Sequence, residues 1–464
     1  MNPQDALVKL WNLTDLPRQA LGQVSLKGAD PVLASSFHVG TAAQTSIAAA
    51  ALAACELGHL RGQPRQHVAV DMAHAALECS GWFSLDGRVP DIWDKFSGLY
   101  RCKDGWLRIH ANFAHHREGA LRLMGIDPTT ATRADAEKAM SGCTTFEFED
   151  AAAAAGLVVA ALRSFEEWDA HPQGQAVAAQ PLMTIERLDA GPGKTPPAML
   201  LPVLGANQLP LAGVRVLDLT RILAGPVCGR MLAGLSADVM LVNSPHLPNI
   251  ESIADTSRGK LSCHIDLKTQ AGVKQLEALA GQAHVFVQGY RPGGLDALGF
   301  GPEQLARMNP GIVVVSLSAY GTQGPWAHKR GFDSLVQTAT GFNHAEMQAS
   351  GADSPRALPM QILDYATGHL MAFAAAAALH RQQREGGSWL VRVSLAQTGA
   401  WLRSMGRVAA GFGVKAPARD LFVKTSDSGF GKLQAIGPSA LLQRTPVHWQ
   451  RPSVPPGTHL PAWP

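Results

Sequence analysis

The chain carries little charge for its size, and neither sign dominates. Charged residues make up 17% of the 464 residues, and the formal net charge is +3. A protein that binds nucleic acid concentrates many basic residues on one face, so this small and dispersed charge argues against a nucleic-acid partner. We therefore expect the chain to act on small molecules.

Long apolar segments are also missing, although 46% of the residues are hydrophobic. The longest apolar runs, Ile47–Cys55 and Leu370–Leu379, are rich in alanine and shorter than the roughly 20 residues that span a bilayer. The first thirty residues mix charged and apolar positions, unlike a signal peptide. These absences predict a cytoplasmic protein with no membrane contact.

Sequence motifs for metals and redox cofactors are absent as well. No Cys-x-x-Cys pair occurs, and His115 and His116 are adjacent rather than one helical turn apart. The first turn after residue 219 lacks the Gly-x-Gly-x-x-Gly fingerprint, and no Walker loop is present. We expect mostly buried, reduced thiols, no metal site and no tightly bound cofactor. The six cysteines are Cys55, Cys79, Cys102, Cys143, Cys228 and Cys263.

What the chain does contain, after residue 211, is a regular alternation of short β-branched runs with helical segments. Near-continuous apolar strands between helices indicate a parallel sheet covered on both faces. This predicts an α/β fold with a doubly wound, mostly parallel, Rossmann-like sheet and a smaller α+β domain. The expected strands are 214–219, 238–242, 262–267, 284–288, 311–317 and 391–395.

Four parts of the chain are expected from these patterns. Residues 1–188 form an N-terminal region that holds the small domain, with a hairpin over 98–109 and a helix over 157–168. A Pro- and Gly-rich linker covers 189–210. The large domain occupies 211–405, and a C-terminal return segment occupies 406–464.

Basic residues follow two of the expected strands in the large domain. Arg221 and Arg291 stand at strand ends, where doubly wound sheets bind ligands. Guanidinium groups bind phosphate oxygens in bidentate fashion, so this edge suits a ligand with several phosphates. Four further basic residues are nearby in sequence: Arg258, Lys260, Lys329 and Arg330.

Asp364 is the most informative residue, because it is a lone carboxylate ahead of an Ala-rich helix predicted over 366–383. Such a carboxylate is explained either by helix capping or by catalysis. A second Ala-rich helix, predicted over 45–57, is also followed by a turn and a short strand, which indicates a weak internal repeat. Aligning Val70 with Val393 puts Thr41 opposite Asp364, and a one-residue shift puts Gly40 there.

Several motifs, in this order, resemble those of the family III CoA transferases, a group that includes α-methylacyl-CoA racemases and carnitine CoA-transferases. The resemblance covers about Leu211 to Met405, with a short matching tail at 437–456. The motifs include Leu211-Ala-Gly-Val-Arg-Val-Leu-Asp-Leu-Thr-Arg-Ile-Leu-Ala-Gly-Pro226, Ser257-Arg-Gly-Lys260, Tyr290-Arg-Pro-Gly-Gly294, Gly331-Phe-Asp333 and Leu363-Asp-Tyr-Ala-Thr-Gly368.

The resemblance implies a transferase that moves CoA from an acyl-CoA to a free carboxylic acid through an aspartyl-acyl anhydride. It implies Asp364 as the nucleophile, coenzyme A as part of the substrate, and a homodimer. Residues along the CoA moiety would be Arg221, Ala224, Arg258, Lys260, Tyr290 and Arg291.

The order of the domains and one motif depart from the family. The segment that resembles the small domain, about 35–188, precedes the large domain instead of following it. Racemases of the family use a histidine where this chain has Phe332, which cannot accept a proton. An acyl-CoA racemase or isomerase, with His369 as a substitute base, and a non-catalytic CoA-binding protein remain the alternatives.

Overall fold

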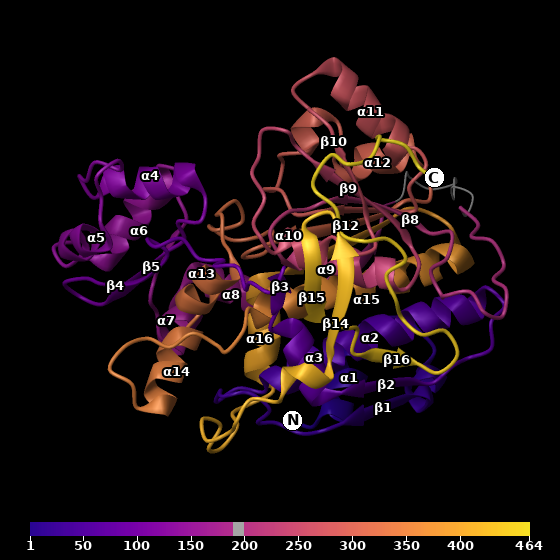
Figure 1. The fold of residues 1–464 in the computed structure, drawn as a ribbon, viewed down its shortest axis with the longest axis horizontal. Helices are drawn as coiled ribbons and strands as arrows, with labels where there is room; N and C mark the ends of the chain where they lie inside the picture. The colour runs from indigo at the N-terminus through magenta and orange to yellow at the C-terminus, as the bar shows by residue number, and fades with distance from the viewer. Residues whose placement is uncertain (189–198) are drawn as a thin grey trace.

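The protein is described by a computed structural model over residues 1–188 and 199–464, and a seven-stranded sheet forms its centre (Figure 1). The strand order is β10-β9-β8-β11-β12-β13-β7, parallel except at β7. Numbered along the chain from β8, this order runs 3-2-1-4-5-6, which is that of the doubly wound dinucleotide-binding fold. The predicted α/β sheet is therefore confirmed. Its strands are β8 (Arg215–Leu219), β9 (Asp238–Asn243), β10 (Leu261–His264), β11 (Val285–Gln288), β12 (Val313–Ser318), β13 (Trp389–Ser394) and β7 (Met183–Arg187).

Helices cover both faces of this sheet because successive side chains of each strand point in opposite directions. Val216 belongs to one apolar core, together with residues of α9, α15 and α2. Its neighbour Leu217 belongs to another, with residues of α11 and α12. These helices are α2 (Val39–Leu60), α9 (Ala224–Gly234), α11 (Gln270–Ala280), α12 (Pro302–Met308) and α15 (Ile362–Glu385).

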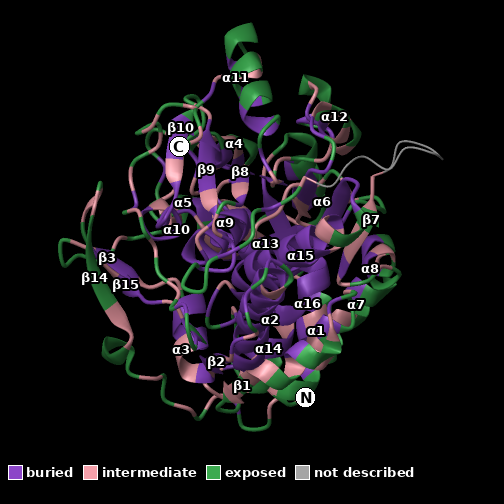
Figure 2. Ribbon diagram, turned by 90° about the vertical axis from the view of Figure 1, so that its right-hand side faces the viewer, coloured by how far each residue is buried: buried purple, intermediate pink, exposed green. Residues whose placement is uncertain are grey.

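The two Ala-rich helices, α2 and α15, pack against each other in the centre of the molecule, where Figure 2 shows both as buried. Alanine at most contact positions lets the helix axes approach closely and leaves almost no side-chain entropy to be lost. By length and hydropathy α15 could cross a membrane, but its apolar window is wholly buried against the rest of the protein. Its composition is thus that of a core helix.

The small α+β domain stands to one side of the main body and has its own apolar core (Figure 1). The predicted hairpin is present as β4 and β5. The helix predicted over 157–168 is wrong, because Val158 and Val159 are buried and residues 159–161 pair with β5; a helix begins only after Ser164, which caps it. The elements are β4 (Gly98–Arg101), β5 (Trp106–Ile109), α4 (Ala114–Leu123), α5 (Arg133–Met140), α6 (Thr145–Ala154) and β6 (Val159–Ala161). The next two helices, α7 (Phe165–Ala170) and α8 (Pro172–Ala178), contribute Trp168 and Val177 to the core of the main body.

Segments distant in sequence are interleaved in the main body. Strand β7, from the N-terminal region, closes the large sheet against β13, and β16 of the C-terminal segment pairs with β2. Strand β15 pairs with β3 in the same way. These strands are β1 (Val24–Lys27), β2 (Val68–Asp71), β3 (Phe83–Leu85), β14 (Val423–Ser428), β15 (Gly431–Ile436) and β16 (Ala440–Leu442).

The expected linker over 189–210 lies partly outside the described residues, which omit 189–198. Residues 199–210 contain no helix or strand, and Arg61 of the N-terminal region donates hydrogen bonds to the carbonyls of Pro202 and Pro210. The remaining helices are α1 (Pro3–Trp11), α3 (Met72–Cys79), α10 (Ile253–Thr256), α13 (Asp333–Ala339), α14 (Phe342–Ser350) and α16 (Leu395–Ser404), with short 3-10 turns at 18–23, 296–298 and 419–421.

Candidate active site

A cleft of about 380 Å³ opens at the carboxyl ends of β8, β11 and β12. Strands β8 and β11 are neighbours in the sheet, but the helices that follow them, α9 and α12, cover opposite faces. The cleft therefore lies at the topological switch point of the fold. Side chains of the small domain complete its wall. The cleft is lined by Phe113, His115, His116, Leu219, Arg221, Ile222, Leu247, Gly289, Tyr290, Arg291, Pro292, Leu317, Ser318, Ala319, Ala327, Lys329, Arg330, Gly331 and Phe332.

The cleft is positively charged, and no acidic side chain is found among the residues that line it. Arg221, Arg291 and Arg330 contribute guanidinium groups, whereas the Lys329 ammonium is paired with Glu149 at 2.9 Å. Burial, with neighbouring positive charges, lowers the pKa of His116 to about 4, so this ring is neutral near pH 7. The charge of the cleft therefore comes mainly from three arginines, which suits a phosphorylated ligand.

Three of the six residues expected along the CoA moiety line this cleft. Arg221 lies over the Phe113 ring, 5.3 Å from its centroid, and donates a hydrogen bond to the carbonyl of Pro248. Tyr290 and Arg291 follow β11 directly, and the Tyr290 N–H donates to Gln288 Oε1 at 3.0 Å. These residues could be predicted to lie here because each follows the carboxyl end of a strand by only two or three positions.

Ala224 lies at the start of α9, next to the cleft residues 221 and 222 but outside the lining. Helix α15 crosses α9 at this point. A Cβ atom on Gly368 would lie 2.4 Å from the carbonyl oxygen of Ala224 and 2.8 Å from Val227. The glycine therefore allows α15 to bring its first turn, with Asp364, close to the start of α9.

Lys260 and Arg258 are placed away from the cleft, in contrast to the expectation. Lys260 is 0% exposed, and its Nζ donates to Asp218 Oδ2 and to the carbonyl of Pro226, both at 2.8 Å. Arg258 donates to Asp255 and to the carbonyl of Ile436. Both cations thus have protein partners that hold the interior together. Sequence proximity to the strand ends did not reveal these buried carboxylates.

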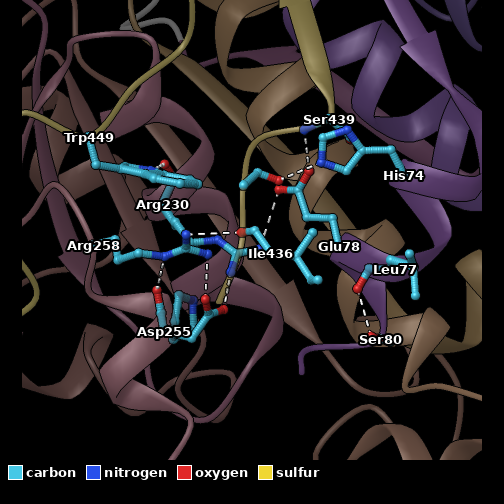
Figure 3. Close-up of polar contacts among 12 residues, drawn as sticks. His74, Leu77, Glu78, Ser80, Arg230, Asp255, Arg258, Ile436, Ser439 and Trp449 are labelled. Carbon is cyan, nitrogen blue, oxygen red and sulfur yellow. Dashed lines mark hydrogen bonds and ion pairs between the residues drawn. The ribbon is translucent and has the colours of Figure 1, made fainter. Parts of the chain in front are cut away.

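Arg258 belongs to a buried ionic cluster that joins three parts of the chain (Figure 3). Arg230 of α9 pairs with Asp255 of α10 and lies 3.6 Å from Glu78 of α3. The Trp449 ring of the C-terminal segment covers the Arg258 guanidinium at 3.9 Å. Two cations and two anions balance one another, so the cluster fastens the N-terminal region to the large domain.

Asp364 is the third residue of α15, which begins at Ile362 rather than at Ala366 as predicted. The carboxylate therefore lies inside the first turn, where it is 8% exposed. Asp333 performs the capping instead: its Oδ2 accepts the Asp364 N–H at 2.9 Å, and it also accepts from the N–H of Leu363. No hydrogen bond to the Asp364 carboxylate is found among the described residues, which leaves its oxygens free for chemistry.

The two aspartates form a coupled pair. Burial raises the pKa of Asp364 well above its usual range, and the neighbouring Asp333 raises it further. Burial also raises the pKa of Asp333, to about 7, although the Asp364 N–H and the Gln337 side chain favour its ionised form. Two like charges this close cannot both ionise easily, so the pair retains a proton near neutral pH.

Phe332 connects the wall of the cleft with the aspartate pair along the chain. It lies in the cleft lining and immediately precedes Asp333 in the chain. Its ring stacks on His110 of the small domain, with centroids 4.0 Å apart. Asp364 is not among the lining residues, and it is joined to this wall through Asp333, which follows Phe332 and accepts the Asp364 N–H.

His369, the alternative base, faces different surroundings. Its ring is buried, and neither nitrogen has a hydrogen-bond partner among the residues described. Burial lowers its pKa to about 4, and the charges that act on it are those of Glu78 and Arg230. His369 is thus associated with the ionic cluster rather than with Asp364.

The repeated helix α2 begins with the same capping arrangement as α15. Asp30 accepts the N–H groups of Gly40 and Thr41 at 3.1 and 2.9 Å. In the register that aligns Val70 with Val393, these positions match the two residues whose N–H groups Asp333 accepts. Thr41 then occupies the place of Asp364, and its hydroxyl donates to Asp30 at 2.7 Å. The N-terminal copy keeps the cap and lacks the second carboxylate.

Comparison with known proteins relates the large domain to a family of enzymes. Residues 211–420 match the family model described as CoA-transferase family III. A Mycobacterium tuberculosis protein named "Probable fatty acyl-CoA transferase" is 35% identical over 40% of this chain and 50% of its own length. An acyl-CoA transferase of Gibberella moniliformis is 29% identical over 73% of this chain and 66% of its own. The succinyl-CoA:glutarate CoA-transferase of Mus musculus is 33% identical over 39% and 44%.

The chain therefore spans about half the length of the curated relatives it matches. The Gibberella match extends well beyond the large domain, because 73% of the chain exceeds the 210 residues of the family model.

Proposed function

Because this chain belongs to CoA-transferase family III through residues 211–420, we propose that it transfers coenzyme A from an acyl-CoA thioester to a free carboxylic acid. The observation that carries the proposal is Asp364, a buried carboxylate with unbonded oxygens, held by Asp333 next to the cleft residue Phe332. The mouse relative named above has a dicarboxylic acid in its name, which fits an acid acceptor.

The basic cleft would hold the CoA part of the substrate. Arg221, Arg291 and Arg330 offer bidentate contacts to its phosphate groups. The Tyr290 ring offers a flat surface for the adenine. With the phosphates at this end, the thioester would extend along Phe332 toward Asp333 and Asp364.

Asp364 would react in four balanced steps. Its carboxylate attacks the thioester carbonyl, the C–S bond breaks, and CoA thiolate leaves an acyl-aspartyl anhydride. The thiolate attacks the aspartyl carbonyl and releases the donor acid as a carboxylate. The acceptor carboxylate then displaces the thiolate to form a second anhydride, and the thiolate attacks the acceptor carbonyl to restore Asp364. No net proton is taken up or released.

Asp333 has two roles in this scheme. It accepts the N–H groups at the start of α15 and so fixes the backbone of Asp364. Its charge also raises the pKa of Asp364, and a more basic carboxylate is a better nucleophile once ionised. Asp364 must be ionised before attack, and its pKa is raised, so the transfer rate should rise with pH as Asp364 loses its proton.

The test is chemical trapping with a panel of acyl-CoA donors and carboxylic acids. Hydroxylamine added during turnover should convert Asp364 into an aspartyl hydroxamate, which mass spectrometry would locate. The isosteric variant Asp364→Asn should form no adduct and lose transfer by at least about 10⁴-fold, while still binding acyl-CoA. Asp427→Asn, on the exposed strand β14, is the matched control and should behave as the wild type.

Two outcomes would count against the proposal. Binding of CoA without an adduct or exchange across the panel would favour a non-catalytic CoA-binding protein. Solvent deuterium incorporated at the α-carbon of a branched acyl-CoA, without exchange of CoA between acids, would favour a racemase.

A further inference from the structure

Strand β5 of the small domain presents two polar residues toward the large domain. Leu107 and Ile109 are buried in the core of the small domain. Since side chains alternate along a strand, Arg108 and His110 point to the opposite face. His110 stacks on Phe332 in the cleft wall, and β5 packs against α13. Arg108 thus lies on the face of β5 that meets the site.

The Arg108 guanidinium lacks the protein partners that the buried arginines of this protein have. Arg163 pairs with Glu149, Arg230 pairs with Asp255, and Arg61 donates to three carbonyls. In the described part of the chain, Arg108 has no hydrogen bond or ion pair; the Trp93 ring lies 5.9 Å from it, and Asp333 and His110 are within electrostatic range. Arg108 is partly exposed and its donors have no protein partner among the described residues, so the guanidinium is available to an anionic ligand.

The charge of Arg108 acts on one aspartate of the pair and not on the other. It lowers the pKa of Asp333, whereas burial and Asp333 are the influences on Asp364. Burial lowers the pKa of Arg108 itself to about 10, so it stays charged at neutral pH. Since β5 packs against α13, which begins at Asp333, the guanidinium lies on the Asp333 side of the pair.

We propose that Arg108 binds the second, non-reacting carboxylate of a dicarboxylic acid whose first carboxylate exchanges CoA at Asp364. This inference rests on the proposed function, because it names the class of acid used at that site. A guanidinium and a carboxylate form two parallel hydrogen bonds, which fixes both the position and the orientation of the acid. A monocarboxylic acid of the same length would leave Arg108 unpaired.

The experiment measures equilibrium binding by isothermal titration calorimetry, so that it does not depend on turnover. Malonate, succinate, glutarate and adipate are compared with the monocarboxylates of equal chain length. The wild type should bind at least one dicarboxylate about tenfold or more tightly than its matched monocarboxylate. Arg108→Gln should remove this preference, and Arg108→Lys should keep part of it. The control is Arg101→Gln, on the exposed side of neighbouring strand β4.

The preference for two carboxylates is the readout that a merely structural role would not change. Equal affinities of the wild type for dicarboxylates and monocarboxylates would overturn the proposal, as would an unchanged preference in Arg108→Gln. A protein that binds dicarboxylates through Arg108 but forms no Asp364 adduct would retain the anion site and refute the transferase. A protein that forms the Asp364 adduct but shows no Arg108-dependent preference would support the transferase and refute the anion site.

Discussion

Replacing Arg230 by methionine tests whether the buried ionic cluster joins the N-terminal region to the large domain. Arg230 is 1% exposed and lies between Asp255 and Glu78 (Figure 3). Methionine fills a similar volume without the charge. Asp255 keeps its ion pair with Arg258, so Glu78 is the carboxylate that loses its compensating charge. Its remaining hydrogen bond comes from the Ser439 N–H at 2.8 Å.

The expected loss follows from the burial of Glu78. Removing one partner of a buried ion pair costs about 3–5 kcal/mol, because the other charge is left uncompensated. Since Asp255 stays paired, the lower end, about 3 kcal/mol, is expected. In the wild type, burial raises the pKa of Glu78, but Arg230, His369 and Ser439 together hold it below the usual value. Without Arg230, burial should raise it above that value.

This reversal gives the loss a pH dependence. The lowered pKa in the wild type contributes stability above about pH 4.5, which disappears as the pH falls through the folded-state pKa. The raised pKa in Arg230→Met would cost stability above about pH 4.5, and this cost would vanish on acidification. The difference between the two proteins should therefore be largest at neutral pH and shrink toward pH 4.5.

Urea unfolding at pH 7.5 and at pH 5 measures this difference through the midpoint and slope. The control is Arg403→Met, which breaks an exposed pair with Asp169 and should cost at most about 1 kcal/mol at either pH. Adding Glu78→Gln to Arg230→Met should recover part of the loss. A loss for Arg230→Met equal to that of the control, or one that does not change with pH, would refute the reasoning.

Two further substitutions probe the first turns of α15. Gly368→Ala should lower the free energy of unfolding in urea by about 1–3 kcal/mol and slow transfer, because its Cβ would press on the Ala224 carbonyl. The control is Gly22→Ala, which has open space around it. Equal losses of stability in the two variants would contradict this. Asp364→Asn should become more stable than the wild type as the pH rises above about 4, because a raised folded-state pKa makes the ionised wild type less stable. The gain should approach about 1.4 kcal/mol per pH unit, and a stability difference independent of pH from 4 to 8 would rule out the raised pKa.

The large sheet could be predicted from the sequence because its strands are buried on both faces and read as continuous apolar runs, as at Val313–Ser318. Arg221 and Arg291 could be placed for the same reason, since each directly follows such a strand. Arg258 could not, because its partner Asp255 and the covering Trp449 are brought to it by the tertiary fold. The short strand at 159–161 was missed because its alanines fit a helix equally well until β5 supplies a pairing edge.

The aspartate pair shows the same limit at the site itself. Asp364 could be selected from its place before an apolar helix, and Asp333 from its motif. Their capping relation, and the equivalent one between Asp30 and Thr41, joins residues about ten to thirty positions apart through loops. Such loops have no periodicity that a sequence pattern can register. Arg108 was missed because a single arginine in a hairpin resembles any surface residue.

Strand β7 closes the large sheet although it precedes that sheet in the chain, and β16 closes a sheet begun by the N-terminal region. The region matched by the family model is therefore not a removable module: excised alone, it would expose the edge of β13 and the whole flank of α15 that α2 covers. Two separate chains covering 1–188 and 199–464 would together retain every one of these strand and helix pairings. Co-expression of two such fragments should thus restore a soluble protein, whereas truncation to the recognisable half should give an insoluble one.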